Sequence, residues 1–465
     1  MASAKANHPD LKRFKNAKVR RDLWNGVLEE AYAYCLPQYE RPTSGTPTDM
    51  GVKGEKRGYT VYDATGSEAV AEKAAMAQGL LFPPFREWMD FEPTMPSSLD
   101  EDQEKKLSEH LEDARVKFHA AIEASNFHTE MAQAMRDSYI STGAITADFG
   151  TPENPLDFEA LPVGQIVPEE SADGVIRTNF REFSVKARDL PVRWPKAKLP
   201  EELIRMIKEN PDKPVTVVDA EVYDPESRES SYRVFAGKEE APIFEDSFGS
   251  QRTIIFRVDK VPGEIMGRGP ALAVMADIKT ANKVVELVLK NASIAVTGIW
   301  QADDDGVLNP ATVKLAPGTI IPKAVGSAGL TPLATPGRFD ISQIVLQDLR
   351  ENIRRAIKGP SLPPADDRVR TAFEIGQREA ERQEVETPRT LRLLNELYYP
   401  LGRRILQILT HPSMAASPYF IKDLEIASEL VRPRPVSPMV RLQDQSDAQL
   451  ATGALTSVMQ AMGAE

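Results

Sequence analysis

Cysteine is almost absent from this sequence, because Cys35 is the only one among 465 residues. An intrachain disulfide needs two cysteines, and the common structural zinc sites need several cysteine or histidine ligands at short spacing. Intrachain disulfides and cysteine-based metal clusters are therefore excluded. This usage is typical of a protein that works in a reducing compartment or is stabilised by assembly.

Long hydrophobic runs are absent as well. A transmembrane helix needs roughly eighteen consecutive apolar residues, and no stretch of the chain approaches that length. The N-terminal residues MASAKANHPDLKRFK are polar and lack the apolar centre of a signal peptide. The sequence therefore predicts neither a secretion signal nor a membrane partner.

Positive charge is in deficit. The chain carries 57 Lys and Arg against 69 Asp and Glu, which gives a net charge of -12. Neutralisation of phosphates by cations drives most non-specific binding to nucleic acid, so a general nucleic-acid clamp is disfavoured. A protein that touches DNA weakly and locally is compatible with this charge.

The motifs of several enzyme classes are missing. The chain has no G-x-x-x-x-G-K-[ST], no H-E-x-x-H and no G-x-S-x-G. Gly267-Arg268-Gly269 begins like a dinucleotide-binding loop, but Pro270 follows and the third glycine of G-x-G-x-x-G is missing. A proline is well tolerated in the first turn of a helix, where its missing N–H would have no partner. Residues 267–270 therefore predict the start of a helix rather than a phosphate site.

The histidines and acidic runs predict no metal site. His110, His119 and His128 are nine residues apart, so neighbours lie on opposite faces of a helix. His110 and His128 share a face but lie roughly 27 Å apart at 1.5 Å per residue. The run QADDDG (301–306) contains ligands for a hard cation, but a solvated turn is the commoner structure for it. We therefore expect no enzyme, no cofactor and no metal.

The first half of the chain has the pattern of a mixed fold. Apolar spacing and capping residues predict these helices: 11–36, a helix that starts at Asp63, Thr65 or Ser67 and stops before Pro83, 99–125 and 126–141. Between 145 and 260, short β-branched and aromatic runs alternate with turn residues, and one helix at 200–210 lies among them. The expected fold class is α+β and mostly helical.

The second half is expected to contain a helix pair. The pattern predicts a helix at about 270–294, an irregular excursion at 297–340 with two short strands, and a helix at 341–358. Two helices that flank an excursion can form an antiparallel stalk with a tip. Beyond a stop with three prolines, the expected features are a long helix to 410 that is kinked or broken at Pro388 and Pro400, a proline-rich stretch (432–438) and a helix from Asp444.

Basic side chains gather on this helix pair. Lys279, Lys283 and Lys290 share one face of the first helix with Glu286. The second helix and the segment after it add Arg350, Arg354, Arg355, Lys358, Arg368 and Arg370. In a chain that is acidic overall, this asymmetry is typical of a path for a polyanion. A solvated surface stripe is the simpler alternative.

Several stretches, taken in order, resemble one family. They are RRDLWNGVLEEAYAYCLPQ, VYDATGSEAVAEKAAMAQGLLFPPFREWMDFEP, MGRGPALAVMADIKTANKVVE, RTAFEIGQREAE and LLNELYYPLGRRIL. Each match is modest alone. Their order and spacing between about residues 20 and 410 resemble the portal, or head-to-tail connector, proteins of short-tailed bacteriophages.

The resemblance implies a ring, usually of twelve subunits, with a central channel at one capsid vertex. Double-stranded DNA would be packaged through this channel and later ejected. The implied parts are a wing (1–263), a first stem helix (264–296), a clip (297–340), a second stem helix (341–358), a tunnel loop (359–370), a long wing or crown helix (371–410) and a crown (411–465). Many relatives continue into a long C-terminal barrel, which we do not expect here because the chain ends at VMQAMGAE.

The resemblance also implies roles for residues. The expected channel residues are Lys279, Lys283, Lys290, Arg350, Arg354, Arg355 and Lys358. The expected tunnel-loop residues are Pro360, Pro363, Pro364, Arg368 and Arg370. The expected joint between wing and stem is Gly267, Arg268, Gly269 and Pro270.

The implied partners are further copies of the chain, the terminase large subunit, a tail adaptor, and the major capsid and scaffolding proteins. DNA would be touched only weakly. The implied location is the head–tail junction of the virion, with assembly in the host cytoplasm. Two alternatives remain: another ring-forming connector or adaptor without a gate, and an α+β enzyme.

Overall fold

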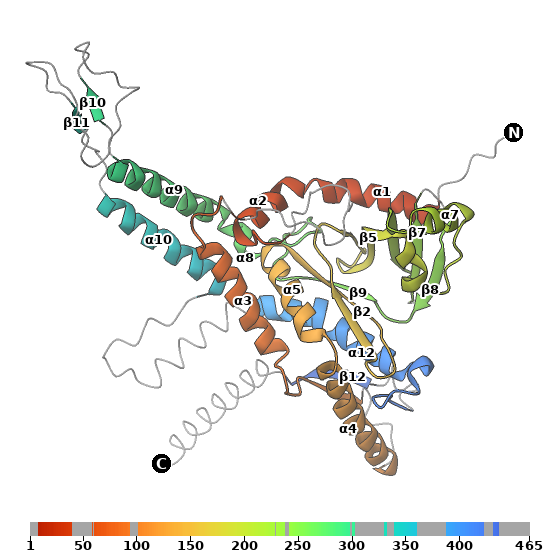
Figure 1. The fold of residues 1–465 in the computed structure, drawn as a ribbon. Helices are drawn as coiled ribbons and strands as arrows, with labels where there is room; N and C mark the ends of the chain where they lie inside the picture. The colour runs from red at the N-terminus through yellow and green to blue at the C-terminus, as the bar shows by residue number, and fades with distance from the viewer. Residues whose placement is uncertain are drawn as a thin grey trace, which may run out of the picture.

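The computed structural model describes residues 8–39, 58, 60–93, 101–227, 229–237, 241–297, 300–302, 330–332, 339–359, 387–422 and 431–436. Helix accounts for 51% and strand for 20%, so the expected α+β class is confirmed. The chain forms a body of helices and sheets from which two long antiparallel helices project as a stalk (Figure 1).

The helices of the described part are α1 (Pro9–Asp22), α2 (Asn25–Cys35), α3 (Thr65–Leu81), α4 (Glu101–Glu123), α5 (Phe127–Ile140), α6 (Leu190–Arg193), α7 (Glu201–Glu209), α8 (Pro270–Ala273), α9 (Met275–Thr297), α10 (Phe339–Lys358) and α12 (Tyr399–Thr410). Shorter turns are the 3-10 turns η2 (Ala187–Asp189) and η4 (Pro412–Met414), and the π-helical turn η3 (Leu394–Tyr398).

The strands are β1 (Met89–Pro93), β2 (Thr142–Phe149), β3 (Leu156–Ala160), β4 (Ile166–Glu170), β5 (Ile176–Lys186), β6 (Pro214–Tyr223), β7 (Ser230–Ala236), β8 (Phe244–Phe248), β9 (Thr253–Arg257), β10 (Trp300–Ala302), β11 (Leu330–Pro332) and β12 (Val431–Pro435). They form a three-stranded sheet in the order β3-β2-β9, a five-stranded sheet in the order β4-β5-β6-β7-β8, and the pairs β1-β12 and β10-β11. The two short strands expected within 297–340 are thus present and pair with each other.

The five-stranded sheet is an antiparallel meander with a different cover on each face. On one face Phe14 of α1 packs against Phe180 of β5, with ring centroids 5.9 Å apart. On the other face β5, β6 and β7 share an apolar cluster with Trp194 and Leu203, which lie beside α6 and in α7. The alternation of side chains along a strand explains this division, because successive residues point to opposite faces.

The main core lies around the three-stranded sheet. It joins α2, α3, α4, α5, α12 and the base of the stalk in one apolar cluster. At its centre Phe82, Trp88, Phe127 and Tyr398 form a group of stacked and edge-to-face rings. Aromatic residues from the two halves of the sequence therefore meet in one core.

The region expected to form one helix over 11–36 is two helices. Leu23 and Trp24 separate α1 from α2. The break lies beside Arg21, a largely buried residue whose guanidinium donates to the carbonyl of Val163 at 3.1 Å and to Asn25 at 2.6 Å. The demand of this buried cation for acceptors outside the helix is a feature that apolar spacing does not reveal.

The later helices also depart from the expectation. The helix expected at 270–294 is interrupted at Val274, between α8 and α9. Pro388 is the second of the helical residues 387–393, and the chain before 387 lies outside the described residues, so the expected break there stays a prediction. The irregularity expected near Pro400 is present as η3, which ends two residues before this proline. Pro400 has no N–H to donate to the carbonyl four residues earlier, and a π-turn is one way in which a helix accommodates such a gap.

The strand pair β1-β12 joins distant parts of the sequence. Phe91 lies opposite Pro433, and Glu92 opposite Arg432. We expected a proline-rich stretch at 432–438 and no strand. Prolines are tolerated in a two-stranded ribbon, where one side of each strand has no ladder to complete.

Candidate functional site: the stalk and its base

The stalk consists of α9, which leads away from the body, and α10, which returns to it (Figure 1). Near the body the two helices bury Ile278, Ala281, Ile353 and Ile357. Further out, four apolar side chains lie 45–61% exposed: Leu287, Leu289, Ile344 and Val345. A helix pair alone leaves these side chains in water, so the outer half of the stalk has apolar surface for a partner.

The joint at Gly267–Pro270 is a packing feature. A side chain on Gly267 would overlap the carbonyl oxygen of Ser141, and one on Gly269 would overlap the carbonyl oxygen of Tyr139. The N–H of Gly269 donates to the Ile140 carbonyl at 2.9 Å. Pro270 occupies the first turn of α8, as the sequence predicts. The glycines are therefore needed for close contact with the α5–β2 junction and do not cradle a phosphate.

Arg268 fixes the outer side of this joint. Its guanidinium bonds Glu264 at 2.6 and 2.9 Å, and it lies 4.8 Å from the centre of the Trp24 ring. The arginine thus connects the start of the stalk to the break between α1 and α2.

A polar clamp holds the base of the stalk, and it was not among the residues that the sequence singled out. The amide oxygen of Asn282 on α9 accepts the N–H groups of Tyr62 and Asp63 at 2.6 and 3.1 Å, and its amide nitrogen donates to the Thr60 carbonyl at 3.2 Å. The carboxylate of Asp63 accepts from Arg350 on α10 at 2.8 Å. Segment 60–63 therefore bonds both stalk helices.

Asp63 is nearly buried, and its environment favours the charged form. Burial opposes ionisation, but hydrogen bonds from Thr65 and Arg350 outweigh it and hold the pKa of Asp63 below its usual value. The sequence did offer a signal for the clamp. Asp63 lies in the stretch VYDATG and Asn282 in DIKTAN, two of the stretches that carry the family resemblance.

The three predicted lysines of α9 all have carboxylate partners. Lys279 pairs with Glu30 of α2. Lys283 and Lys290 both pair with Glu286, at 2.9 and 2.5 Å. One carboxylate between two lysines leaves this outer stretch with excess positive charge, whereas the contact of Lys279 attaches α9 to the body.

The predicted cations of α10 differ from one another. Arg350 is bonded to Asp63, Lys358 to Glu72 of α3, and Arg355 to Glu351 at 3.1 Å. Arg354 is exposed and forms no ion pair within the residues that the structure describes. Of these four, Arg354 is therefore the side chain most available to an outside anion.

The tunnel-loop residues Pro360, Pro363, Pro364, Arg368 and Arg370 lie outside the described residues. Most of the expected clip also lies outside them, as does the chain after residue 436. The described chain resumes at 387, in the helix that leads to η3.

That helix is bonded to the joint through Arg257 of β9. Arg257 is fully buried, and its guanidinium bonds Glu396 of η3 at 2.8 Å and the Ile265 carbonyl at 2.8 Å. Arg389 in the same helix pairs with Asp259 at 3.0 Å. The helix after the tunnel-loop segment and the start of the stalk thus share contacts on one short stretch, 257–267.

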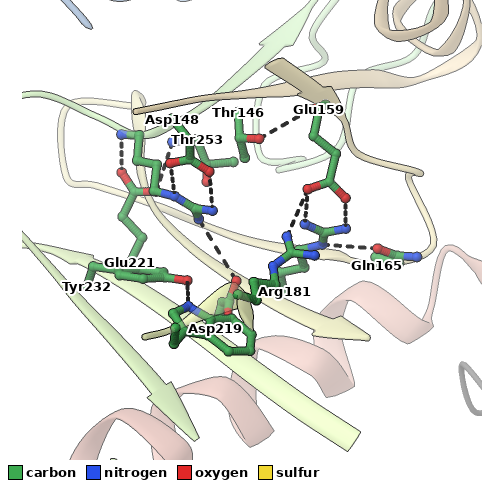
Figure 2. A network of polar contacts seen from close by, with 12 residues as sticks. Thr146, Asp148, Glu159, Gln165, Arg181, Asp219, Glu221, Tyr232 and Thr253 are labelled. Atoms are coloured by element: carbon green, nitrogen blue, oxygen red, sulfur yellow. Dashed lines mark hydrogen bonds and ion pairs between the residues drawn. The ribbon is translucent and has the colours of Figure 1, made fainter. Parts of the chain in front are cut away.

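The most enzyme-like feature is a polar cluster between the two larger sheets (Figure 2). Asp148 accepts two bonds from Arg252 at 2.5 and 2.6 Å, and Glu159 accepts from Arg181 at 2.5 and 3.0 Å. The cluster contains four carboxylates, on Asp148, Glu159, Asp219 and Glu221, and four guanidiniums, on Arg181, Arg193, Arg252 and Arg404. Carboxylates and guanidiniums are thus equal in number and contact one another, which fits the general pairing of buried charges in proteins.

The pKa values in this cluster fit structural roles. Burial opposes ionisation of Glu159, but Arg181 and Arg193 prevail and lower its pKa to about 2. Burial raises the pKa of Asp219 and of Glu221. Glu221 accepts the backbone N–H groups of Arg252 and Thr253 at 2.7 and 2.9 Å, so it fastens one sheet to the other. Within the described ranges, no group of three or more His, Cys, Asp or Glu side chains is placed to hold a metal ion.

No helix in the described part of the chain has the length and apolar character needed to cross a bilayer. Two components of a phage-like particle are among the solved structures that resemble this chain. A chain from the virion of a native gene transfer agent (GTA) particle is 11% identical with a TM-score of 0.34, over 85% of this chain and 88% of that one. A chain from the neck of an empty GTA particle is 12% identical with a TM-score of 0.33, over 84% and 86%.

No curated protein matches the sequence. The sequence does match one protein family, described as bacteriophage head to tail connecting protein, over residues 10–465. This match spans nearly the whole chain, and it agrees with the resemblance that the ordered stretches indicate. The protein belongs to the bacteriophage head to tail connecting protein family.

Proposed function

We propose that the chain is the subunit of a portal: a closed ring of copies, usually twelve, at one vertex of a phage capsid. Double-stranded DNA would enter the head through the central channel during packaging and leave through it at ejection. The observation that carries this proposal is the stalk, which projects from the body with exposed apolar side chains on both helices. In a ring of copies, neighbouring stalks would cover these side chains and line a channel.

We assign the parts of a portal subunit to the residue ranges that the sequence indicates. The body up to residue 263 is the wing, α9 and α10 are the stem, and 297–340 is the clip that meets terminase and later a tail adaptor. Residues 359–370 form the tunnel loop, with Pro360, Pro363, Pro364, Arg368 and Arg370 near the DNA at the narrowest level. Residues 371–410 are a long wing or crown helix, and 411–465 belong to the crown.

The proposed channel chemistry is weak and local. Sparse positive groups on an otherwise acidic wall can centre a duplex without retaining it. Among the candidate cations, Arg354 has no carboxylate partner in the described part of the chain, and Lys283 and Lys290 share one. We assign the first contact with phosphates to these three. Lys279, Arg350 and Lys358 are assigned mainly to holding the stalk, because their partners lie on the body.

We propose no catalytic activity for the chain. Packaging would be driven by a separate terminase ATPase, and the other partners would be the major capsid and scaffolding proteins in the host cytoplasm. In the finished virion the ring would lie at the head–tail junction. The purified protein should hydrolyse no ATP. An ATPase activity that copurifies with the chain and is lost on one substitution would contradict this.

Electron microscopy with negative stain, together with sedimentation at micromolar concentration, tests the ring. A ring with a central hole supports the portal, and a monomer at every salt concentration contradicts it. The double variant Lys283→Gln and Lys290→Gln, which leaves Lys279 and its contact with Glu30 in place, then tests the channel. Rings that form normally but package or retain less DNA, with a salt-dependent defect, support the channel assignment. Rings with normal packaging at every salt concentration assign the lysines to a solvated surface. They would also leave open the alternative of a connector without a gate.

A further inference from the structure

The outer face of α1 and the adjoining turn is positively charged in a protein that is negatively charged overall. Lys12, Lys15 and Arg20 are exposed on this helix, and they form no ion pair with any residue that the structure describes. Two apolar side chains lie among them, Val19 with 68% of its surface exposed and Leu23 with 80%. We call these five residues the basic face.

The side chains on the inner side of the same helix already have partners on the five-stranded sheet. Phe14 is buried on the five-stranded sheet, Arg13 pairs with Glu169 of β4 at 2.9 Å, and Lys18 pairs with Glu182 of β5. The cations that help α1 to bind the sheet are therefore different from those of the basic face. The exposed cations form no ion pair with the described residues of this subunit, and two large apolar side chains beside them remain in water.

A surface of opposite charge lies at one edge of the same sheet. Five exposed carboxylates occupy the β6–β7 turn and the edge strand β8: Asp224, Glu226, Glu229, Glu245 and Asp246. We call this set the acidic edge. Half-buried Phe244 and Phe248 lie in the same strand, so apolar surface accompanies the charge here as well.

The acidic edge is only slightly neutralised by the described residues. Arg233 lies 3.7 Å from Glu245 but bonds Asp10 at 2.7 Å. Glu229 accepts from a hydroxyl, that of Ser247, at 2.7 Å. Arg228 of the β6–β7 turn lies outside the described residues. Even with that arginine counted, the five carboxylates leave the edge negative.

We propose that the basic face of one copy binds the acidic edge of a neighbouring copy. The contact rests on the proposed ring and identifies one of its interfaces. The two surfaces differ in sequence and structure, one being a helix and the other a strand edge with a turn. They therefore form a heterologous contact, the type from which cyclic assemblies are built. Charges of opposite sign set the register, while Val19 and Leu23 add apolar burial.

Charge reversal on each face, separately and together, tests the contact. One variant combines Lys12→Glu, Lys15→Glu and Arg20→Glu, the second combines Glu226→Lys, Glu245→Lys and Asp246→Lys, and the third carries all six changes. Native mass spectrometry and sedimentation measure the protein concentration at half assembly. We expect an increase of about tenfold for each single-face variant at low salt, because several exposed pairs are lost together and like charges oppose. The six-change variant should return to within about threefold of the wild type.

A matched control and salt make the result specific. Glu109→Lys, Glu112→Lys and Glu153→Lys change the net charge as much as the acidic-edge variant does, at exposed sites elsewhere. They should leave assembly unchanged. The defects of the single-face variants should shrink at high salt, because exposed charges are screened. Circular dichroism melting curves check that each variant is folded.

Several outcomes would overturn the contact. Single-face variants that assemble like the wild type, or a six-change variant that fails to recover, contradict it while leaving the ring intact. Normal assembly of the basic-face variant with lost binding of duplex DNA would assign that face to nucleic acid instead. A wild-type chain that stays monomeric in all conditions contradicts the proposed ring and this interface together.

Discussion

The carboxylate of Glu396 accepts hydrogen bonds from the backbone N–H of Arg257 and from two nitrogens of its guanidinium, at 2.9, 3.1 and 2.8 Å. Glu396 lies in a π-helical turn, and Arg257 ends the strand that leads to the stalk. Gly267 approaches the side chain of Arg257 closely. This pair therefore fixes the helix that follows the tunnel-loop segment against the first residues of the joint.

Removing Glu396 should be strongly destabilising. Glu396→Ala removes the carboxylate that bonds the fully buried guanidinium of Arg257 directly, and only Glu170, 3.6 Å away, remains as a counter-charge. Loss of one partner from a buried pair costs about 3–5 kcal/mol. Urea unfolding measures the difference. The control is Arg355→Gln, which breaks an exposed pair within α10 and should change stability by less than about 1 kcal/mol. Equal effects of the two changes would mean that Glu396 contributes no more than a surface carboxylate.

Adding even one methyl group to the joint at Gly267–Pro270 should destabilise the protein. Gly269→Ala places a side chain against the carbonyl of Tyr139, which is backbone and unable to move aside. We expect a loss of about 1–3 kcal/mol from overpacking. Gly26→Ala in α2 is the matched control, because nothing lies within 4 Å of the added carbon, and it should stabilise by about 0.5–1 kcal/mol. Thermal melts show whether each variant is more or less stable than the wild type. A Gly269→Ala variant as stable as the wild type would refute the close contact.

The clamp at Asp63 should respond to acid. The pKa of Asp63 is lowered in the folded state, so its ionised form contributes stability that is complete above the unfolded value of about 3.9 and is lost as the pH falls further. Asp63→Asn keeps the shape and removes this titration. The stability advantage of the wild type over the variant should therefore be constant from pH 5 to pH 7 and shrink below about pH 4. A difference that is the same at all pH values would argue against ionisation of Asp63 in the clamp.

His119 should make the body sensitive to milder acid. Its Nδ1–H donates to the Arg115 carbonyl at 2.9 Å, while Nε2 accepts from the backbone N–H of Trp88 at 3.0 Å. Burial lowers the pKa of His119, because a charged ring would be poorly solvated there. Protonation would also stop Nε2 from accepting the N–H of Trp88. Stability from the neutral ring is complete above the unfolded pKa of about 6.5 and declines as the pH falls below it.

His119→Gln tests this dependence. Gln offers an acceptor oxygen but does not titrate. The wild type should lose more stability than the variant between pH 7.5 and pH 5, as measured by urea unfolding at each pH. Protection of the Trp88 amide from hydrogen exchange should fall in the wild type over the same range. Parallel pH profiles of the two proteins would rule out His119 as the sensing group.

Arg354 should matter for DNA more than its neighbour does. Arg354→Gln removes an exposed cation without a carboxylate partner among the described residues, whereas Arg355→Gln removes one that is paired with Glu351. If the channel assignment is right, Arg354→Gln should change retained DNA more than Arg355→Gln does, and the difference should fade with added salt. Ring formation should be normal in both. Identical DNA retention in the two variants would place Arg354 away from the channel.

Much of this architecture was predictable from local patterns. The helix that ends before Pro83, the helix at 200–210 and the Pro270 helix start all follow from spacing, capping and the chemistry of proline. The stalk followed from two amphipathic helices on either side of an excursion. Such features depend on residues within a few turns of one another, and for that reason sequence periodicity detects them.

The missed features depend on long-range partners. The break at Leu23 and Trp24 lies beside Arg21, whose acceptor Val163 is distant in sequence. Lys279 forms its ion pair with Glu30 on another helix, and Arg350 forms its ion pair with Asp63. A helical wheel places a lysine on a face but contains no information about a carboxylate on another helix. The expected channel cations were therefore identified by position alone, and the contacts that distinguish them became visible only in three dimensions.

The strand pair β1-β12 sets the order of events during synthesis of the chain. Arg434 bonds Glu92 across 342 residues of sequence. At roughly 5–20 residues per second on the ribosome, β1 is made about 20–70 s before its partner strand emerges. The stalk is complete during that interval, while the edge of β1 is still unpaired. The body of the subunit therefore closes only after the stalk has been synthesised.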